Sequence, residues 1–532
     1  MMNILVNAEI MADEKMSDKY NSLTKVICYL LVMYCVLIRC YLYFYHKDLW
    51  LDESYIADAL YEVSWSDLFS GRLPRLQSCP LFFAVVNKLL SEVTNYSPYV
   101  LYFLPTVAGI VTTFLIYHFG MKLYGCMFTA CCLTIFALMY MHLYYSSEFK
   151  PYIFDFLFTI VLFGNLFVDL RKTQVTCISI FLSKKYPLLF AVSWLCSSTA
   201  IICAASVGIT IFIYLCLNRK LALTAIILKL IKIYWLFVIF AGIYYVFYLK
   251  QGASNRMYVD WKAGFIPAHL SEIPQWFNLT LKSVYYGLTT NIYGHILSHT
   301  IFGLAICGFL TVFFVQKYEF IAFAVLFILI FALATKIYPI GLSGGFIAAR
   351  LSFYVLPVFI FLAAHGIWSI VNIWCRYQFR FKLFILMLIF TVALFGVTQS
   401  GVRYFKNRIH HQETSQMYKM VSEQYNESTD LIVVNHWAEP SFKYWKIYNS
   451  QIDKLPFVSI SSYKLISLKD DLFVLIGKHN YESKKRIFFL FSHLINPKLK
   501  NNVMNYFKNH GFPVREFRWP GALMLIIDIG KH

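Results

Sequence analysis

The stretch VICYLLVMYCVLIRCYLYFYHKDLWLDES, residues 26–54, decides the fold of this chain. Its first part, Val26 to Tyr45, is apolar and reaches the ~20 residues that a helix needs to cross a bilayer. Lys25 precedes it and no small-residue cleavage site follows, so we expect an uncleaved first helix and not a signal peptide. The stretch then ends on Asp52 and Glu53, two adjacent carboxylates at a water boundary. Such a pair is typical of membrane proteins that carry out chemistry or transport there.

The composition of the whole chain indicates a polytopic membrane protein. Of its 532 residues 59% are hydrophobic and 14% are charged, and the mean hydropathy is +0.59, which exceeds what a soluble chain needs. The net charge of +19 lies in short clusters beside apolar runs. These clusters favour topology signals and contacts with the lipid bilayer over a nucleic-acid partner. The 13 cysteines show no disulfide framework or zinc spacing.

The apolar runs predict a polytopic α-helical membrane domain of about eleven transmembrane helices, followed by a small soluble α/β domain. A cytoplasmic tail over residues 1–25 precedes the membrane domain, which covers 26–400. Its long outer loops lie at about 47–98 and 250–299. The amino terminus is then inside and the last domain outside.

One apolar run leaves the topology open. Residues Pro187 to Cys216 are long for a single span and short for two. We expect a tight hairpin around Ser197 to Ser206, because Arg219 and Lys220 then fall on the inside, as the positive-inside rule requires. The same rule marks the segment from Asp169 to Tyr186 as cytoplasmic.

The carboxy-terminal part, residues 401–532, has ordinary polar content and reads as a soluble α/β domain. It carries no catalytic motif, and the whole chain shows no repeat, phosphate-binding loop or nucleotide fingerprint. Apolar runs and helical periodicity predict strands at Asp430–Asn435, Arg486–Phe491 and Leu523–Ile527, and helices at Glu439–Tyr448 and Lys498–Asn509.

Two cations stand in outer segments where Lys and Arg are normally scarce. Lys150 lies in Glu148-Phe-Lys-Pro-Tyr152, and Arg350 stands at the head of a late span. Either one alone would be read as a snorkelling anchor at a helix end. Two such cations facing one acidic pair favour a site that holds a phosphate and performs chemistry beside it.

The other candidate residues have simpler explanations of equal or greater weight. Arg72 and Arg75, in the long first loop, could serve the same phosphate, but solvated surface charge explains them as well. Asp52 and Glu53 could be the N-cap and first-turn acid of a helix that begins near Ser54.

Three motifs in order resemble the integral-membrane GT-C glycosyltransferases, and within them the branch of protein O-mannosyltransferases and bacterial aminoarabinose transferases. They are Trp50-Leu51-Asp52-Glu53, Glu148-Phe-Lys-Pro-Tyr152 and Arg350-Leu-Ser-Phe-Tyr-Val-Leu-Pro357. The order of elements is similar over the whole chain, and the carboxy-terminal domain is similar to that of bacterial members.

The resemblance implies a site. The first acid of the pair would act on the acceptor, which maps onto Asp52 with Glu53 as its neighbour. Basic residues at the outer mouth would hold the donor's phosphate, which maps onto Lys150 and Arg350, with Tyr152 beside them. The metal-binding branches use more widely spaced acids, and this chain has no clear version of that pattern, so the sequence does not indicate a divalent metal and leaves metal dependence open.

The chemistry of such a transfer suits these residue types. A sugar that leaves on a phosphate needs cations to stabilise the departing charge, and the fork of an Arg can do so bidentately. The attacking hydroxyl must lose its proton, and a carboxylate within ~3 Å can accept it. One base and two cations would allow a single in-line displacement with inversion.

We therefore expect a glycosyltransferase of the bacterial inner membrane that moves a sugar from polyprenyl phosphate to a lipid, glycan or protein acceptor on the periplasmic face. The first alternative is a transporter or flippase of lipid-linked sugars, which should show paired halves or broken helices in matching positions. No such symmetry is visible. The second is a non-catalytic scaffold whose outer domain binds glycan, which would leave Asp52 without a task.

Overall fold

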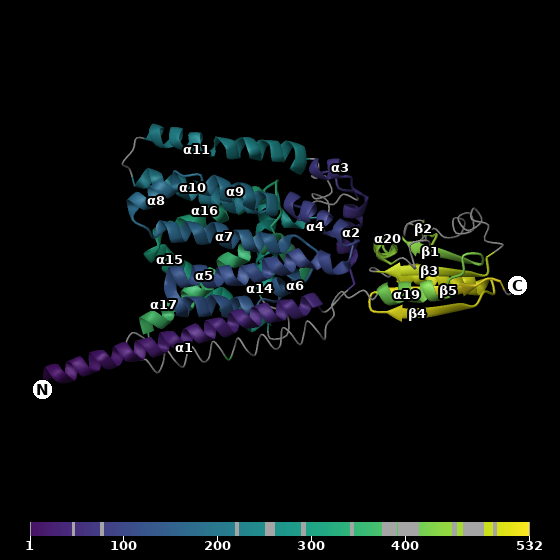
Figure 1. The fold of residues 1–532 in the computed structure, drawn as a ribbon, viewed down its shortest axis with the longest axis horizontal. Coiled ribbons are helices and arrows are strands. Elements are labelled where there is room, and N and C mark those ends of the chain that lie inside the picture. The colour runs from purple at the N-terminus through teal and green to yellow at the C-terminus, as the bar shows by residue number, and fades with distance from the viewer. Residues whose placement is uncertain are drawn as a thin grey trace.

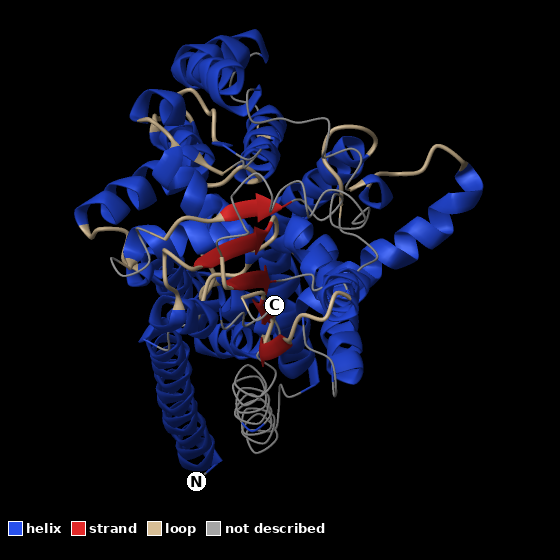
Figure 2. Ribbon diagram, turned by 90° about the vertical axis from the view of Figure 1, so that its right-hand side faces the viewer, coloured by secondary structure: helices blue, strands red, loops and turns tan. Residues whose placement is uncertain are grey.

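The structure is a computed structural model, and it describes residues 2–44, 48–74, 79–218, 223–250, 261–288, 294–340, 345–374, 391, 414–449, 455–460, 484–492 and 497–530. Its long axis holds a bundle of helices, with a small sheet domain at one end (Figure 1). The strands lie together in that domain and the rest is almost wholly helical (Figure 2). The amino terminus lies at the opposite end of the bundle (Figure 1).

Eight helices among the described residues are long and apolar enough to cross a membrane. They lie in α1 (Met2–Phe44), α5 (Pro98–Leu138), α7 (Tyr152–Leu170), α10 (Ala200–Leu217), α11 (Leu223–Tyr244), α15 (Gly294–Val315), α16 (Lys317–Ala334) and α17 (Leu356–Trp374). A pair bent by 47°, α8 (Gln174–Phe181) and α9 (Lys185–Cys196), would add a ninth. The last predicted span, which ends near Ser400, lies outside the described residues. The predicted fold class is confirmed.

The helix α5 reverses direction at Gly125. Gly125 has φ +81° and ψ −166°, a conformation that is essentially restricted to glycine. Beyond it a shorter apolar helix, Cys126–Leu138, returns along the first arm. Gly120 on the first arm lies so close to Thr129 on the second that a Cβ there would be 3.2 Å from the Thr129 Cα. The reversal places Lys122 beside the turn.

Residues 187–216 form two helices rather than one. The chain breaks between α9 and α10 at Ser197–Thr199, and the two helices contact each other. The Ser197 hydroxyl donates to Asp155 Oδ1 at the start of α7, with an O–O distance of 2.5 Å. The hairpin that the charge pattern favours is therefore present, and its tip is joined to a neighbouring span.

Basic residues gather at the end of the bundle away from the sheet domain. There Asp169 accepts hydrogen bonds from Lys172 at 2.6 Å and Tyr186 at 2.9 Å, and Arg171 pairs with Glu319 at 3.1 Å. These contacts neutralise two buried carboxylates. They place the segment predicted to be cytoplasmic opposite the sheet domain.

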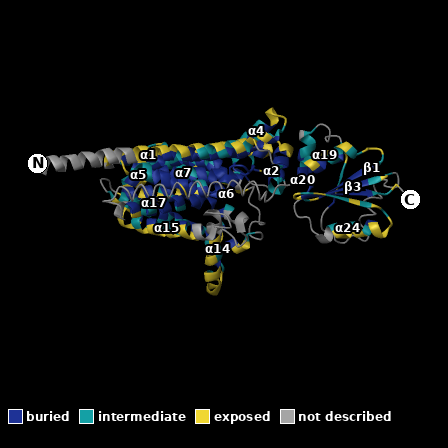
Figure 3. Cartoon of the chain, turned by 90° about the horizontal axis from the view of Figure 1, so that it is seen from below, coloured by how far each residue is buried: buried dark blue, intermediate teal, exposed yellow. Residues whose placement is uncertain are grey.

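Shorter helices cover the bundle end that faces the sheet domain. They are α2 (Leu51–Glu62), α3 (Trp65–Phe69), α4 (Leu81–Val93), α6 (Tyr140–Tyr145), α14 (Ile273–Leu288) and the 3-10 segment η5 (Gly345–Val355). The outer half of α14 stands away from the bundle, at a steep angle to its axis (Figure 3). Arg350 lies in η5, the 3-10 segment that leads into α17, and stands at the head of the candidate span Arg350–Val371, as the sequence predicts.

The sheet domain has five strands in the order β2-β1-β3-β5-β4. β1 is parallel to β2 and β3, whereas β5 is antiparallel to β3 and β4. The helices α19 and α20 cover one face and α24 covers the other. The bounds are β1 (Asp430–Asn435), β2 (Val458–Ile460), β3 (Arg486–Ser492), β4 (Val514–Trp519), β5 (Ala522–Asp528), α19 (Thr414–Gln424), α20 (Glu439–Tyr448) and α24 (Pro497–Asn509).

The sheet domain contacts the bundle through α2 and α20. Lys443 of α20 pairs with Glu62 of α2 at 3.4 Å, and the Tyr444 hydroxyl donates to the Tyr96 carbonyl at 2.6 Å. The helix that carries Asp52 is thus held between the bundle and the sheet domain (Figure 1).

Candidate active site

The helix α2 begins directly after the first span, and its first turn carries both acids of the sequence motif. Glu53 Oε2 accepts a hydrogen bond from the Trp50 backbone N–H at 3.0 Å. This contact satisfies a backbone donor that a helix start leaves without a partner. The capping explanation thus applies to Glu53.

Glu53 also joins α2 to the turn that carries Lys150. Its Oε1 accepts a hydrogen bond from the Phe149 backbone N–H at 2.6 Å, and its side chain is completely buried. The side chain of Asp52 is one-third exposed, at 33%. The two neighbouring carboxylates therefore have different surroundings: Glu53 is occupied by backbone donors, and Asp52 faces the accessible space.

Asp52 brings the two predicted cations together. Arg350 Nη1 lies 3.1 Å from Asp52 Oδ2, and Lys150 Nζ lies 3.9 Å from the same oxygen. The side chains of Lys150 and Arg350 are only 6% and 14% exposed. Two cations that are far apart in the sequence thus approach the same oxygen atom of Asp52, at the end of the bundle where α2 meets the sheet domain.

Aromatic rings surround the Arg350 guanidinium. Its central carbon lies 4.6 Å from the ring centre of Trp261 and 5.9 Å from that of Tyr152. Tyr145 stacks edge-on against Tyr152 at 5.1 Å. Burial raises the pKa of the Tyr145 phenol well above its usual range, so it stays a neutral hydroxyl at neutral pH. Tyr152, predicted to belong to the phosphate site, contacts Arg350 through its ring.

A buried pair beneath the site was missed by the sequence analysis. Arg39 of α1 donates to the Cys35 carbonyl at 2.6 Å and contacts His142 Nδ1 of α6 at 2.5 Å. Gly109 lies beside this pair, where a Cβ would be 2.7 Å from the Ser146 Cβ. The pair fixes α6 and the start of the turn that ends at Lys150. A charged residue inside an apolar span was the signal that could have found it.

Of the two remaining predicted cations, Arg72 and Arg75, the structure describes only Arg72. Arg72 is exposed, and its backbone N–H donates to the Asp67 carbonyl at 3.0 Å. Within the described ranges no ion pair links Arg72 to Asp52. Arg75 lies outside the described residues.

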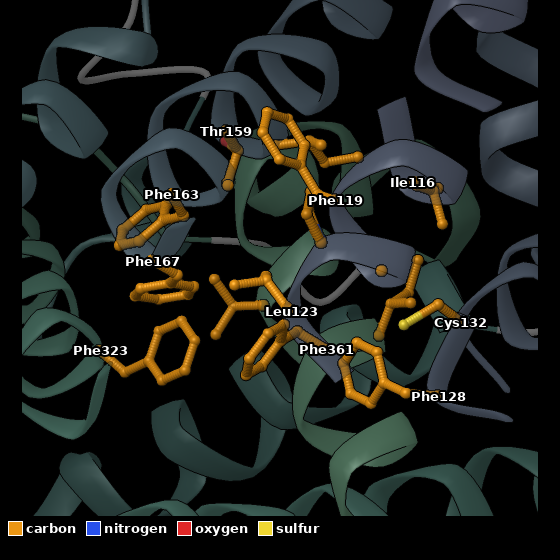
Figure 4. Close-up of a pocket in the computed structure, with 16 residues that line it drawn as sticks. Ile116, Phe119, Leu123, Phe128, Cys132, Thr159, Phe163, Phe167, Phe323 and Phe361 are labelled. Carbon is orange, nitrogen blue, oxygen red and sulfur yellow. The ribbon is translucent and has the colours of Figure 1, made fainter. Parts of the chain in front are cut away.

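A separate apolar cavity of about 70 Å³ lies inside the bundle between α5, α7, α16 and α17. Its walls are mostly aromatic and aliphatic, with Phe119, Phe163 and Phe361 among them (Figure 4). No charged side chain lines it, so the polar chemistry belongs to the site around Asp52. In the described part of the chain no three His, Cys, Asp or Glu side chains gather as a metal site would require.

Two structures of one solved protein share this architecture. ArnT from Cupriavidus metallidurans in the apo state superimposes with a TM-score of 0.55 at 10% identity, over 97% of this chain and 98% of that one. The same protein bound to undecaprenyl phosphate superimposes with a TM-score of 0.50 at 10% identity, over 96% and 98% of the two chains. The oligosaccharyltransferase of Archaeoglobus fulgidus gives 0.44 at 12% identity, over 86% and 67%.

The chain has the fold of the integral-membrane GT-C glycosyltransferases. Within that class it is similar to ArnT over nearly the whole of both chains, including the carboxy-terminal domain. No family model matches the sequence. No curated protein matches it either.

Proposed function

We propose that this protein is a glycosyltransferase that moves a sugar from a polyprenyl-phosphate donor to an acceptor. The observation that carries the proposal is the convergence of Lys150 and Arg350 on Asp52 Oδ2. The GT-C fold supports it, since one solved structure of this fold is bound to undecaprenyl phosphate.

In this proposal the two cations bind the phosphate of the donor. Arg350 and Lys150 neutralise its charge and stabilise the polyprenyl phosphate as it leaves the sugar. The ring of Tyr152 restrains Arg350 from one side. Because the leaving phosphate is a stable anion, no general acid is needed on that side of the reaction.

Asp52 then acts as the base that receives the proton of the acceptor hydroxyl. The acceptor oxygen attacks the anomeric carbon of the sugar while the bond from that carbon to the phosphate oxygen breaks. The configuration at the anomeric carbon inverts in this single in-line displacement. Glu53 has a supporting role, because its two oxygens bind backbone N–H groups of α2 and of the turn before Lys150.

Binding of the donor would also change the ion pairs that Asp52 makes with Lys150 and Arg350. Asp52 is the counter-anion of both cations before any phosphate arrives. A bound phosphate would replace Asp52 as the partner of Arg350 and Lys150, and the freed carboxylate could then accept a proton. Donor binding would in this way precede activation of the acceptor.

We place the reaction on the periplasmic face of the bacterial inner membrane, with the amino terminus in the cytoplasm. The support is the positive-inside rule: Arg171, Lys172 and Lys185 lie at the bundle end opposite the site. The donor's lipid tail would stay in the outer leaflet while its head group enters the site.

The test is transfer of radiolabelled sugar from polyprenyl phosphate to a crude envelope acceptor by purified protein in detergent. Asp52→Asn should lower the rate at least ~100-fold, because general-base catalysis contributes factors of that order. Glu62→Gln, which changes another carboxylate of the same helix, should transfer like the parent. Transfer by folded Asp52→Asn at the parental rate would overturn the assignment of the base.

A further inference from the structure

The indole of Trp261 lies against the guanidinium of Arg350, with 4.6 Å between the guanidinium carbon and the ring centre. Trp261 comes from the outer loop after α11 and is half-buried. It is the nearer of the two rings that contact Arg350, since Tyr152 lies at 5.9 Å. None of the three motifs of the sequence includes it.

The backbone after Trp261 is tied to the bundle. The Trp261 carbonyl accepts from Gly264 N–H at 2.9 Å, and the Gly264 carbonyl accepts from Ile340 N–H at 2.9 Å. Ile266 N–H donates to the Ala334 carbonyl at the end of α16, also at 2.9 Å. The indole is therefore presented by a short anchored segment, η3 (Lys262–Gly264), and not by a free loop tip.

The guanidinium itself has few polar restraints. Arg350 Nη1 donates to Asp52 at 3.1 Å, whereas the buried Nε has no hydrogen-bond partner among the residues that the structure describes. An Arg fork has five N–H donors, and ring stacking leaves those donors free at the edge of the plane. The rings, more than hydrogen bonds, set the orientation of this side chain.

We propose that Trp261 is a positioning residue for the donor phosphate and acts through Arg350. This inference rests on the proposed function, in which Arg350 binds that phosphate. When phosphate replaces Asp52, Arg350 loses its hydrogen bond to the Asp52 carboxylate. The indole of Trp261 then keeps the guanidinium in the same plane. The Arg350 side chain therefore loses less conformational entropy when it binds the donor phosphate.

The effect depends on the charge of the ligand. A stacked Arg and indole interact with an energy that corresponds to about threefold to thirtyfold in affinity. The loss should appear for undecaprenyl phosphate and not for undecaprenol, which has the same tail and no phosphate. A purely structural role of Trp261 would weaken both lipids alike.

The experiment measures the affinity of detergent-purified protein for these two lipids. Trp261→Leu removes the π-face and keeps an apolar side chain, and should bind undecaprenyl phosphate about threefold to thirtyfold more weakly. Trp261→Phe should recover part of that affinity. Trp276→Leu is the matched control: Trp276 belongs to the same outer loop, but its ring packs against Phe331 at 6.3 Å, so this variant should bind like the parent.

A double-mutant cycle shows whether Trp261 acts through Arg350. In an Arg350→Ala background, Trp261→Leu should cause no further loss for undecaprenyl phosphate. Parental affinity in Trp261→Leu, or an equal loss for both lipids, would overturn the inference and leave the proposed function standing. If the parent chain does not discriminate between the two lipids, the phosphate site fails, and the role of Trp261 fails with it.

Discussion

At the residue scale, Asp52 and Glu53 show how neighbouring side chains of the same chemistry are assigned different tasks. Glu53 is completely buried and its oxygens accept two backbone hydrogen bonds of 3.0 and 2.6 Å. Asp52 is the partner of two side-chain cations that belong to distant parts of the chain. A helix cap and the shared partner of two cations therefore occupy adjacent positions.

Since Asp52 neutralises Lys150 and Arg350 at rest, it competes with the donor phosphate for both. Asp52→Asn should therefore bind undecaprenyl phosphate more tightly than the parent, although it should transfer sugar at least ~100-fold more slowly. The gain should be about twofold to fivefold, because Asp52 is one-third exposed and such ion pairs are screened by solvent. Isothermal titration in detergent at low salt would measure it. An affinity below that of the parent would show that Asp52 helps to hold the phosphate.

The sequence singled out Asp52, Lys150 and Arg350, which the structure brings together, because charges at span ends need a reason. It distinguished Asp52 from Glu53 only through the family resemblance, since the partner of Glu53 is the backbone of Phe149, far along the chain. Trp261 has no local signal at all, because aromatic residues are common in membrane-surface loops. Its role depends on a long-range contact.

At the element scale, the turns between helices place the site. The loop at residues 146–151 follows α6, which Arg39 contacts through His142. Within the loop, the Phe149 backbone N–H donates to Glu53. The hairpin tip between α9 and α10 is joined to α7 through Ser197 and Asp155. These contacts lie at the bundle end that carries the site, where helix termini would otherwise be free to move.

The reversal of α5 at Gly125 can be tested by substitution. Its φ of +81° and ψ of −166° strain any residue with a Cβ, even though no heavy atom lies within 4 Å of that position. Gly125→Ala should lower the free energy of unfolding by about 1–3 kcal/mol, as measured by denaturation in detergent. Gly303→Ala, in the body of α15 and equally uncrowded, should not destabilise the protein. Equal stability of the two variants would contradict the assigned backbone conformation.

The elements of the sheet domain were predicted to different degrees. The helix α20 and the strand β1 have the predicted bounds, since long apolar or periodic runs determine them. Two strands were not predicted. β2 has only three residues, and β4, VREFRW, is half-exposed and charged, so its pairing with β5 defines it more than its own composition does.

At the scale of the whole molecule, the site and the sheet domain share one end of the bundle, and the basic residues of the segment from Asp169 to Tyr186 lie at the other. Hydropathy predicts about eleven spans, whereas eight described helices, or nine with the bent pair, are long and apolar enough to cross a bilayer, and the last predicted span lies outside the described residues. Hydropathy did not predict how the helices pack. α15 and α17 approach so closely that a Cβ on Gly308 would lie 1.8 Å from the Leu362 carbonyl oxygen, which no linear pattern indicated.

The proposed orientation predicts which surfaces an impermeant thiol reagent reaches in intact cells whose outer membrane has been opened. Lys508→Cys, exposed on α24 of the sheet domain, should be labelled. Lys122→Cys, exposed beside the Gly125 turn at the opposite end, should react only after the inner membrane is broken. The parent gives the background from native thiols such as the exposed Cys307. Labelling of Lys122→Cys alone in intact cells would reverse the topology.

The affinity for undecaprenyl phosphate is the sharpest test of whether Lys150 and Arg350 bind the phosphate of a lipid-linked donor. We expect Arg350→Ala and Lys150→Ala each to weaken binding at least ~10-fold, since each removes a charge-assisted contact. Arg72→Ala, which removes an exposed outer cation without an ion pair to Asp52, should bind like the parent. Parental affinity in both Arg350→Ala and Lys150→Ala would contradict the account.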